Sequence, residues 1–255
     1  MIALPRQQDA EHKGWLLRVL SALFDRPTIS KALAFKGGTC AAMRGFLDRF
    51  SVDLDFDYLA APDRLAHVRR EMEDVFDSLG LRIKDKSAVS AQYFLAYNPT
   101  QGHRSTLKID AVFPPLASNR YEHARLPEID RVIRCQTRAT MFANKLVALT
   151  DRWRKRQAIA GRDVYDIHSF FLRGFSYDAT VITEQRPDVD LIAFFREMIG
   201  FVERHVTQQV IDQDLNHLLP YQSFRMLRMI LVEETLRLIH DEIRRIEAGA
   251  DNMKA

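Results

Sequence analysis

The stretch "FKGGTCAAMRGFLDRFSVDLDFDYL", residues Phe35–Leu59, is the most informative part of this sequence for fold and function. It ends in three aspartates, Asp53, Asp55 and Asp57, that alternate with apolar residues. A strand with this pattern places its apolar side chains on one face and its carboxylates on the other. Because like charges on one face of a strand repel one another, such a row of carboxylates requires compensation. The acidic strand is therefore a candidate functional site.

A glycine pair, Gly37-Gly38, precedes this strand and follows the apolar run "LAF", which predicts another short strand. Thr39 then stands near the start of a helix that we predict over "TCAAMRGFL", as its cap. A glycine turn between a strand and a helix presents backbone N–H groups, and these can bind phosphate oxygens. An isolated glycine pair is also compatible with a simple tight turn, so both interpretations remain open.

The acidic strand is also a candidate metal site. Asp53 and Asp55 are two residues apart, so their carboxylates point the same way and can share a divalent ion. Mg²⁺ takes one or two carboxylates and completes its shell with water and phosphate oxygens. Asp110, in "LKIDAVF", lies on a separate predicted strand and would complete the site if that strand neighbours the first. The alternative is a solvated strand face. Asp57, at the outer end of the strand, is assigned no direct role.

Composition bounds the class of protein. The chain has 255 residues, 47% hydrophobic and 28% charged, with a formal net charge of +3. These values are ordinary for a globular protein and compatible with a polyanionic partner. The two cysteines, Cys40 and Cys135, have no CxxC spacing, which argues against a disulfide framework or a zinc site and favours the cytoplasm. No signal peptide or membrane span is apparent, so no membrane partner is expected.

The remaining sequence predicts two domains. Apolar spacing predicts helices over 11–24 and 61–80, and β structure over 81–113 with a hairpin turn in "NPTQGH". After Thr140, four amphipathic segments predict helices: 141–156, 161–174, 190–206 and 221–247. We therefore expect an N-terminal α/β domain over residues 1–135 and a helical C-terminal domain over 136–255.

Three motifs in this order resemble the AbiEii/AbiGii toxin family, which belongs to the DNA polymerase β-like nucleotidyltransferase superfamily. They are "KGGT", "RxSxDLDF" and "KLVALTDR…GRDVYDI", and the resemblance spans roughly residues 33–172. One departure is "GGTCAAMRG", where "GGTAL" is more usual. The resemblance implies an α+β fold, in which a mixed sheet flanked by helices is followed by a C-terminal helical bundle that completes the active site.

The resemblance also implies transfer of a nucleotide from an NTP with Mg²⁺ or Mn²⁺. Carried over to this sequence, and with Asp110 added from the strand pattern, the predicted catalytic residues are Asp53, Asp55, Asp110, Lys145 and Asp163, the first three as metal ligands. The predicted nucleotide-binding residues are Gly37, Gly38, Thr39, Arg49, Ser51, Lys145 and Asp166. Asp163 matches the first acid of the family's "RDxxD", but Asp166 shares its helix face, so the choice between them stays open. Asp110 can also accept the proton of the acceptor hydroxyl.

The segment "DRWRKRQ" contains Arg152, Trp153, Arg154, Lys155 and Arg156. Basic residues around an aromatic can hold an RNA backbone and stack on a base, although a solvated helix end looks the same. Members of the family are toxins of toxin–antitoxin or phage-defence systems, and some add nucleotides to the tRNA acceptor end. The resemblance thus implies a cytoplasmic toxin with an RNA acceptor such as tRNA and an antitoxin encoded adjacently. Two alternatives are a kinase-like phosphotransferase and a nucleotide-binding module without catalysis.

Overall fold

The structure is a computed structural model that describes residues 4–98 and 104–252. The chain divides into two compact units, Met1–Thr137 and Arg138–Ala255. The first unit combines a sheet with helices and the second is helical, which confirms the predicted α+β class. Most of the predicted turn "NPTQGH" lies outside the described residues.

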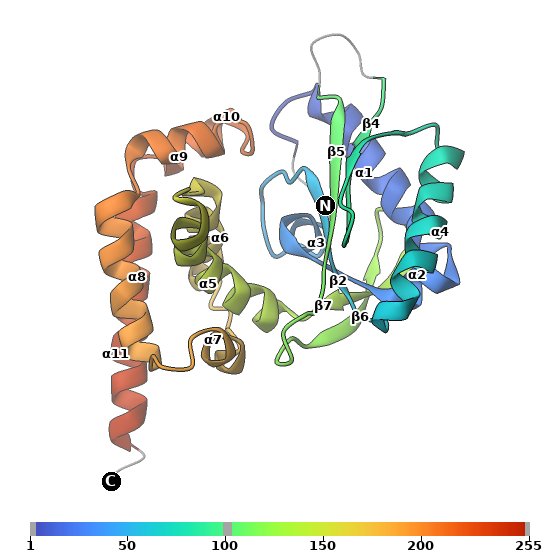
Figure 1. Ribbon diagram of the computed structural model, residues 1–255. Helices are drawn as coiled ribbons and strands as arrows, with labels where there is room; N and C mark the ends of the chain where they lie inside the picture. The colour runs from blue at the N-terminus through green and yellow to red at the C-terminus, as the bar shows by residue number, and fades with distance from the viewer. Residues whose placement is uncertain (1–3, 99–103, 253–255) are drawn as a thin grey trace. The chain divides into compact units, whose positions relative to one another are not determined.

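The described residues of the first unit form a mixed seven-stranded sheet in the order β3-β4-β5-β2-β1-β7-β6 (Figure 1). The strands are β1 Leu33–Lys36, β2 Asp53–Tyr58, β3 Arg82–Lys86, β4 Ala91–Ala96, β5 Thr106–Val112, β6 Tyr121–Leu126 and β7 Arg131–Gln136. The pairs β2–β5 and β1–β7 are parallel, and the other neighbours are antiparallel. The acidic strand β2 therefore lies at the centre of the sheet.

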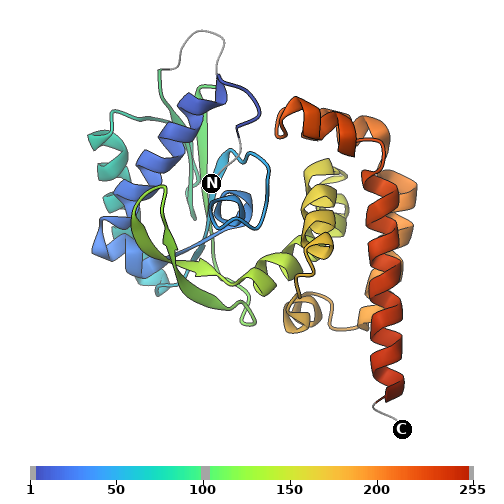
Figure 2. The ribbon, with the colours of Figure 1, turned by 180° about the vertical axis from the view of Figure 1, so that it is seen from behind.

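Helices of the first unit cover one face of this sheet. The unit contains α1 Asp9–Phe24, α2 Pro27–Ala32, α3 Gly37–Met43, the 3₁₀ helix η1 Pro62–Arg64 and α4 Leu65–Ser78. Figures 1 and 2 show α1, α2 and α4 together along one side of the sheet. The ring of Phe56 lies 6.1 Å from that of Phe24 on α1. Side chains alternate along a strand, so the carboxylate of Asp55, next to Phe56, points to the opposite face.

Helix α3 is shorter than the sequence predicts, and a glycine explains where it ends. Gly45 has a φ of +74°, which ends a helix because other residues rarely adopt this conformation. The Phe46 amide donates to the Ala41 carbonyl at 2.8 Å, and the Gly45 amide donates to the Ala42 carbonyl at 3.1 Å. These two bonds form a Schellman motif. The predicted helix over 39–47 therefore starts two residues earlier and ends at Met43.

The sheet confirms the predicted β4–β5 hairpin pairing and adds two strands that the sequence did not predict. β6 lies at the edge of the sheet, and its residues Glu122, His123 and Arg125 are exposed. An edge strand with charges on both faces lacks the alternation that marks a strand in sequence. Its partner β7 pairs in parallel with β1, where Phe35 faces Cys135.

The second unit consists of helices around an aromatic core. They are α5 Arg138–Arg156, α6 Gly161–Leu172, α7 Ala179–Gln185, α8 Leu191–His205, α9 Gln208–Leu215, α10 Tyr221–Leu227 and α11 Leu231–Asn252. The ring of Phe142 lies 5.0 Å from that of Phe170, and the ring of Tyr177 lies 5.5 Å from that of Phe195. Among the described residues, no helix combines the length and the apolar character needed to span a bilayer.

The last predicted helix, over 221–247, is wrong as a single element. α10 ends at Leu227, and a turn closed by the Ile230 amide donating to the Leu227 carbonyl at 3.1 Å precedes α11. Neither glycine nor proline stands at this turn. The apolar periodicity continues across it, with Phe224 and Leu231 both buried seven residues apart, so the sequence pattern does not mark the break.

Candidate functional site

The acidic strand lies beside the strand of Asp110, as the sequence predicted. β2 and β5 pair in parallel, with Asp55 opposite Asp110 and Asp53 opposite Lys108. Cα partners in a ladder carry their side chains on the same face, so three of the predicted carboxylates share one face of the sheet. Within residues 4–98 and 104–252, no group of three or more His, Cys, Asp or Glu residues is arranged as a metal site.

The glycine turn packs directly against the acidic strand. Gly37 has a φ of +77°, and a Cβ added there would lie 2.9 Å from the Cβ of Asp55. A Cβ on Gly38 would lie 2.8 Å from both the Arg49 guanidinium and the Ser51 hydroxyl. A larger residue at either position would displace one of these groups. The sheet unit thus brings the predicted phosphate turn, the acid Asp55, Arg49 and Ser51 into one place.

Thr39 and Arg49, two residues of this cluster, make contacts that differ from the helix cap and the nucleotide ligand that the sequence predicted. Thr39 does not cap α3, because its hydroxyl donates to the Asp53 carbonyl at 2.5 Å and α3 has no side-chain cap. This bond links the glycine turn to the start of β2. Arg49 is only 2% exposed, and its Nη1 donates to the Phe50 carbonyl at 2.9 Å. An arginine at this position could either neutralise phosphate or brace the acidic cluster, and the burial of Arg49 favours bracing.

Asp57 is the functional residue that sequence reasoning missed. It is fully buried, and its carboxylate accepts from Lys36 Nζ at 2.6 Å, Asn119 Nδ2 at 3.0 Å, the Tyr121 hydroxyl at 2.8 Å and Gln136 Nε2 at 2.6 Å. Burial and then the adjacent carboxylate raise the pKa of Tyr121, so its hydroxyl remains a donor. Because Lys36 immediately precedes the glycine turn, Asp57 anchors that turn to β2, β6 and β7.

The sequence contained only one hint of this anchor, which was the lysine before the glycine pair. Alternation places Asp57 on the same face as Asp53 and Asp55, which are partly exposed, but the structure buries Asp57. Its three neutral donors are 62 to 79 residues further along the chain. Two of them lie on β6 and β7, the strands that the sequence did not predict.

Asp110 has a different environment. Its Oδ2 accepts from Lys108 Nζ at 2.6 Å and from Gln92 Nε2 at 3.0 Å. Gln92 lies on β4, directly opposite Asp110 in the ladder. The side chains of Lys108 and Asp110 are 30% and 25% exposed, so this pair remains accessible to a ligand.

In the helical unit, Lys145 is held by both candidate acids. Its Nζ lies 2.9 Å from Asp163 Oδ1 and 2.8 Å from Asp166 Oδ2, and Arg152 lies 3.2 Å from Asp163 Oδ2. Both carboxylates are buried. Burial raises the pKa of Asp163, but the charges of Lys145 and Arg152 outweigh it and lower that pKa to about 2. Asp163 and Asp166 therefore together orient one lysine.

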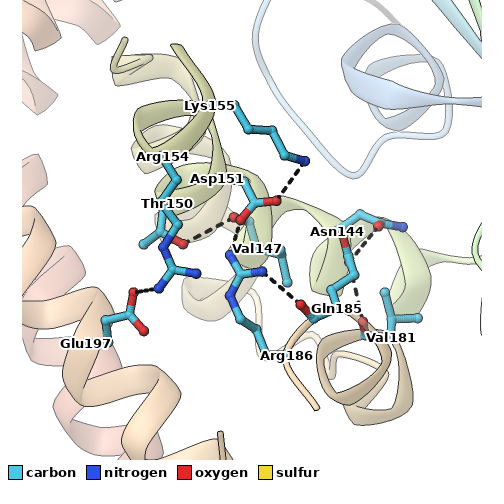
Figure 3. A network of polar contacts seen from close by, with 10 residues as sticks. All are labelled: Asn144, Val147, Thr150, Asp151, Arg154, Lys155, Val181, Gln185, Arg186 and Glu197. Carbon is cyan, nitrogen blue, oxygen red and sulfur yellow. Dashed lines mark hydrogen bonds and ion pairs between the residues drawn. The ribbon is translucent and has the colours of Figure 1, made fainter. Parts of the chain in front are cut away.

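The basic segment at the end of α5 is largely paired with acids. Figure 3 shows Asp151 in contact with both Lys155 and Arg186, and Arg154 in contact with Glu197. Exposed ion pairs like Lys155–Asp151 are weak and can exchange partners. These contacts lower the net positive charge that the segment offers to an RNA backbone.

The aromatic residue of this segment, Trp153, packs against α8, which leaves its ring less available to stack on an RNA base. The ring of Trp153 lies 4.4 Å from that of His205 on α8. Arg152 is engaged with Asp163, whereas Arg156 at the end of α5 is exposed. RNA contact by this segment therefore remains a prediction, and Arg154, Lys155 and Arg156 are its exposed basic residues.

Comparison with known sequences now identifies the family. Residues 18–237 match the protein family described as "Nucleotidyl transferase AbiEii toxin, Type IV TA system". The chain belongs to this family. The resemblance inferred from the glycine turn and the acidic strand is confirmed, and the match extends beyond residues 33–172 at both ends. AbiEii proteins are nucleotidyl transferase toxins of a type IV toxin–antitoxin system.

Two crystal structures of Helicobacter pylori proteins share the fold. JHP933 is 17% identical, with a TM-score of 0.58, and the match covers 99% of this chain and 100% of that one. A second protein, proposed in its description to be a nucleotidyltransferase, is 18% identical with a TM-score of 0.57, covering 94% of this chain and 98% of that one. At these identities the likeness shows the fold alone. No curated protein matches the sequence.

Proposed function

We propose that this AbiEii protein transfers a nucleoside monophosphate from an NTP to an acceptor, with Mg²⁺ or Mn²⁺ bound at its acidic strand. The observation that carries the proposal is the contact between the glycine turn and β2, where Gly37 leaves room only for the Asp55 carboxylate. Phosphate-binding amides and metal-binding carboxylates lie together in this chemistry, because a cation held by the carboxylates would neutralise the phosphates held by the amides.

The donor set of the sheet unit fits a divalent cation. Asp53 and Asp55 lie on one strand, and Asp110 lies opposite Asp55 on the next. These carboxylates are hard oxygen ligands of the kind that Mg²⁺ and Mn²⁺ prefer. The bound ions would neutralise charge on the phosphates and polarise the reacting phosphorus.

The residues around this centre have separate roles in the proposed reaction. Backbone amides of Gly37 and Gly38, with the Ser51 hydroxyl, bind the triphosphate. The acceptor hydroxyl oxygen attacks the α-phosphorus, the bond to the bridging oxygen breaks, and pyrophosphate leaves. The proton of that hydroxyl passes to Asp110. The family resemblance also assigns Lys145 to the phosphates, and within the helical unit Asp163 and Asp166 orient its ammonium.

We further propose tRNA as the acceptor and the cytoplasm as the compartment, as the family resemblance suggests. A toxin that modifies tRNA requires control, so we expect an antitoxin encoded adjacently and a role in phage defence. Support from the structure is limited to the exposed Arg156 at the end of α5, which suits an RNA backbone.

The test is incubation of the protein with total tRNA and each of the four NTPs, labelled at either the α- or the γ-phosphate. We expect α-label on tRNA and none from the γ-position. γ-Label on an acceptor would instead support a kinase-like phosphotransferase. Nucleotide binding without transfer of either label would support a non-catalytic module.

Two variants test whether the acidic strand is responsible for α-label transfer. Asp53→Asn removes a proposed metal ligand and should abolish α-label transfer. Asp48→Asn removes a carboxylate upstream of β2 that has no proposed role, and it should leave transfer within about twofold of the wild type, as for most surface substitutions. Full activity in the Asp53 variant would show that the metal assignment is wrong.

A further inference from the structure

A partly exposed lysine on β5, Lys108, lies beside the acidic residues of the candidate site. It lies opposite Asp53 in the ladder, while Asp110, two residues further on, lies opposite Asp55. Side chains two residues apart on a strand share a face, so Lys108 is an ammonium group among three carboxylates. The other nearby lysine, Lys36, is engaged with the buried Asp57.

Lys108 and Gln92 hold Asp110 in different ways. Both donate to the same carboxylate oxygen, Oδ2, at 2.6 and 3.0 Å. Gln92 is a short neutral side chain that lies directly across the ladder. Lys108 has a flexible four-carbon stem and is 30% exposed, so its ammonium can leave Asp110 without disturbing the sheet. Gln92 can fix the orientation of the carboxylate while Lys108 supplies a replaceable charge.

A divalent cation and the Lys108 ammonium would compete for the Asp110 carboxylate. Mg²⁺ binds carboxylate oxygen at about 2.1 Å. The ammonium lies 2.6 Å from Asp110 Oδ2, so a cation bound to this carboxylate would repel it. Arrival of the cation therefore favours movement of the ammonium away from Asp110. The only strongly anionic group that arrives with the cation is the triphosphate, which is a good partner for a lysine.

Resting on the function proposed above, we propose that Lys108 is an exchangeable counter-ion. Without nucleotide it occupies Asp110 and offsets the repulsion among the three carboxylates. When a divalent cation and an NTP bind, its ammonium passes from Asp110 to the phosphates. Lys108 thus weakens binding of the cation alone and strengthens binding of the nucleotide that accompanies it. An ion pair that stays on Asp110 would weaken cation binding but would not supply a charged hydrogen bond to the nucleotide, so the effect on the nucleotide separates the two cases.

The test uses Mn²⁺ alone as the probe and compares Lys108→Gln with Lys84→Gln. Lys84 lies on the edge strand β3, on the far side of β4 from β5, and donates to the Thr106 hydroxyl at 3.2 Å. Its substitution therefore removes the same charge from the same sheet without removing an ion pair with an acid. We expect Lys108→Gln to bind Mn²⁺ about fivefold more tightly, which is the upper range for an exposed ion pair. Lys84→Gln should stay within about twofold of the wild type.

The second readout is nucleotidyl transfer by the intact protein. Lys108→Gln should raise the KM for NTP about tenfold, the effect of one lost charged hydrogen bond. Lys108→Arg, which keeps the charge, should restore Mn²⁺ affinity to near the wild-type value. Equal or weaker Mn²⁺ binding by Lys108→Gln than by Lys84→Gln would overturn the inference, and so would an unchanged KM.

Failure of the proposed function has a different signature. In that case Asp55→Asn would bind Mn²⁺ as tightly as the wild type, and no α-label would be transferred by any variant. If Asp55→Asn loses Mn²⁺ binding and the wild type transfers label, but Lys108→Gln matches the wild type in both assays, the function stands and Lys108 is only a surface residue.

Discussion

The candidate carboxylates of the sheet unit and those of the helical unit lie in opposite environments. On the sheet, Asp53, Asp55 and Asp110 are partly exposed and lie side by side on two paired strands. In the helical unit, Asp163 and Asp166 are buried and bind one lysine. A partly exposed group of like charges is accessible to an external cation, whereas two buried carboxylates that share one lysine fix the position of that side chain.

Asp57 shows that the distinction depends on burial and partners, because it lies on the acidic strand yet resembles the acids of the helical unit. It is fully buried and has four donors. Alternation along a strand is therefore insufficient to identify a metal ligand. Among the aspartates of β2, the environment separates Asp57, an anchor, from Asp53 and Asp55.

The largest effects on stability and activity are expected when aspartate is replaced by asparagine at two positions of β2, Asp57 and Asp55. Asp57→Asn leaves the Lys36 ammonium without its carboxylate, so we expect the free energy of unfolding of the sheet unit to fall by about 3 kcal/mol. Asp55→Asn relieves repulsion and should change stability by less than about 0.5 kcal/mol, but it should lower transfer at least about a hundredfold. Urea unfolding and the labelled-NTP assay measure the two effects.

The opposite results for these two variants would contradict the distinction between a buried anchor, Asp57, and an accessible carboxylate, Asp55. A stable Asp57→Asn protein with normal activity would mean that the buried network is dispensable. A strongly destabilised Asp55→Asn protein would mean that Asp55 is itself a structural anchor. Activities are to be compared at a temperature at which both variants are folded.

The sequence was sufficient to predict the central strands of the sheet and the face of the sheet on which the candidate carboxylates lie. The Gly37-Gly38 turn and the alternation around Asp53 and Asp55 are local patterns, and they predicted β1, β2 and the side on which the carboxylates lie. The neighbouring position of Asp110 was a conditional prediction, and the pairing of β2 with β5 confirms it. The catalytic and binding roles of these residues stay predictions.

The features that the sequence missed depend on contacts between distant segments. The three neutral donors to Asp57 come from β6, β7 and the loop before them, and an exposed edge strand such as β6 has no apolar pattern to reveal it. The break between α10 and α11 is set by a turn that lacks glycine and proline. At β6 the pairing with β7 decides the structure, and between α10 and α11 a local turn does so, and neither has a distinctive sequence pattern.

The two units should also differ in their response to acid, beginning with the sheet unit at mildly acidic pH. His12 is buried, donating to the Val52 carbonyl and accepting from the Tyr97 hydroxyl. Burial lowers the pKa of His12 from 6.5 to about 4, because the fold accommodates only the neutral ring. Its stabilisation is complete above pH 6.5 and is lost as the pH falls towards 4, at a cost of about 3 kcal/mol.

Trp15 and Trp153 lie in different units, so each can report on one of them. A Trp153→Phe background leaves Trp15, which stacks on Tyr97, to follow unfolding of the sheet unit in urea at each pH. In this background, His12→Gln should abolish most of the pH dependence between 6.5 and 4. His67→Gln, which changes an exposed histidine of the same unit, should preserve it. Equal pH profiles for these two variants would show that His12 is not the group responsible.

The smallest expected effect is in the helical unit, at still lower pH. Because the folded-state pKa of Asp163 is about 2, below its ordinary 3.8, its stabilisation is present above pH 3.8 and is lost as the pH falls towards 2. We expect a loss of about 2 kcal/mol over this range, followed by Trp153 fluorescence in a Trp15→Phe background. Asp163→Asn should remove this loss, whereas Asp241→Asn, at an exposed position of α11, should not. A sheet unit that unfolds before the helical unit on acidification would then follow from one buried histidine and one paired aspartate. Simultaneous unfolding, with both Trp residues reporting one transition, would show instead that the two units depend on each other for stability.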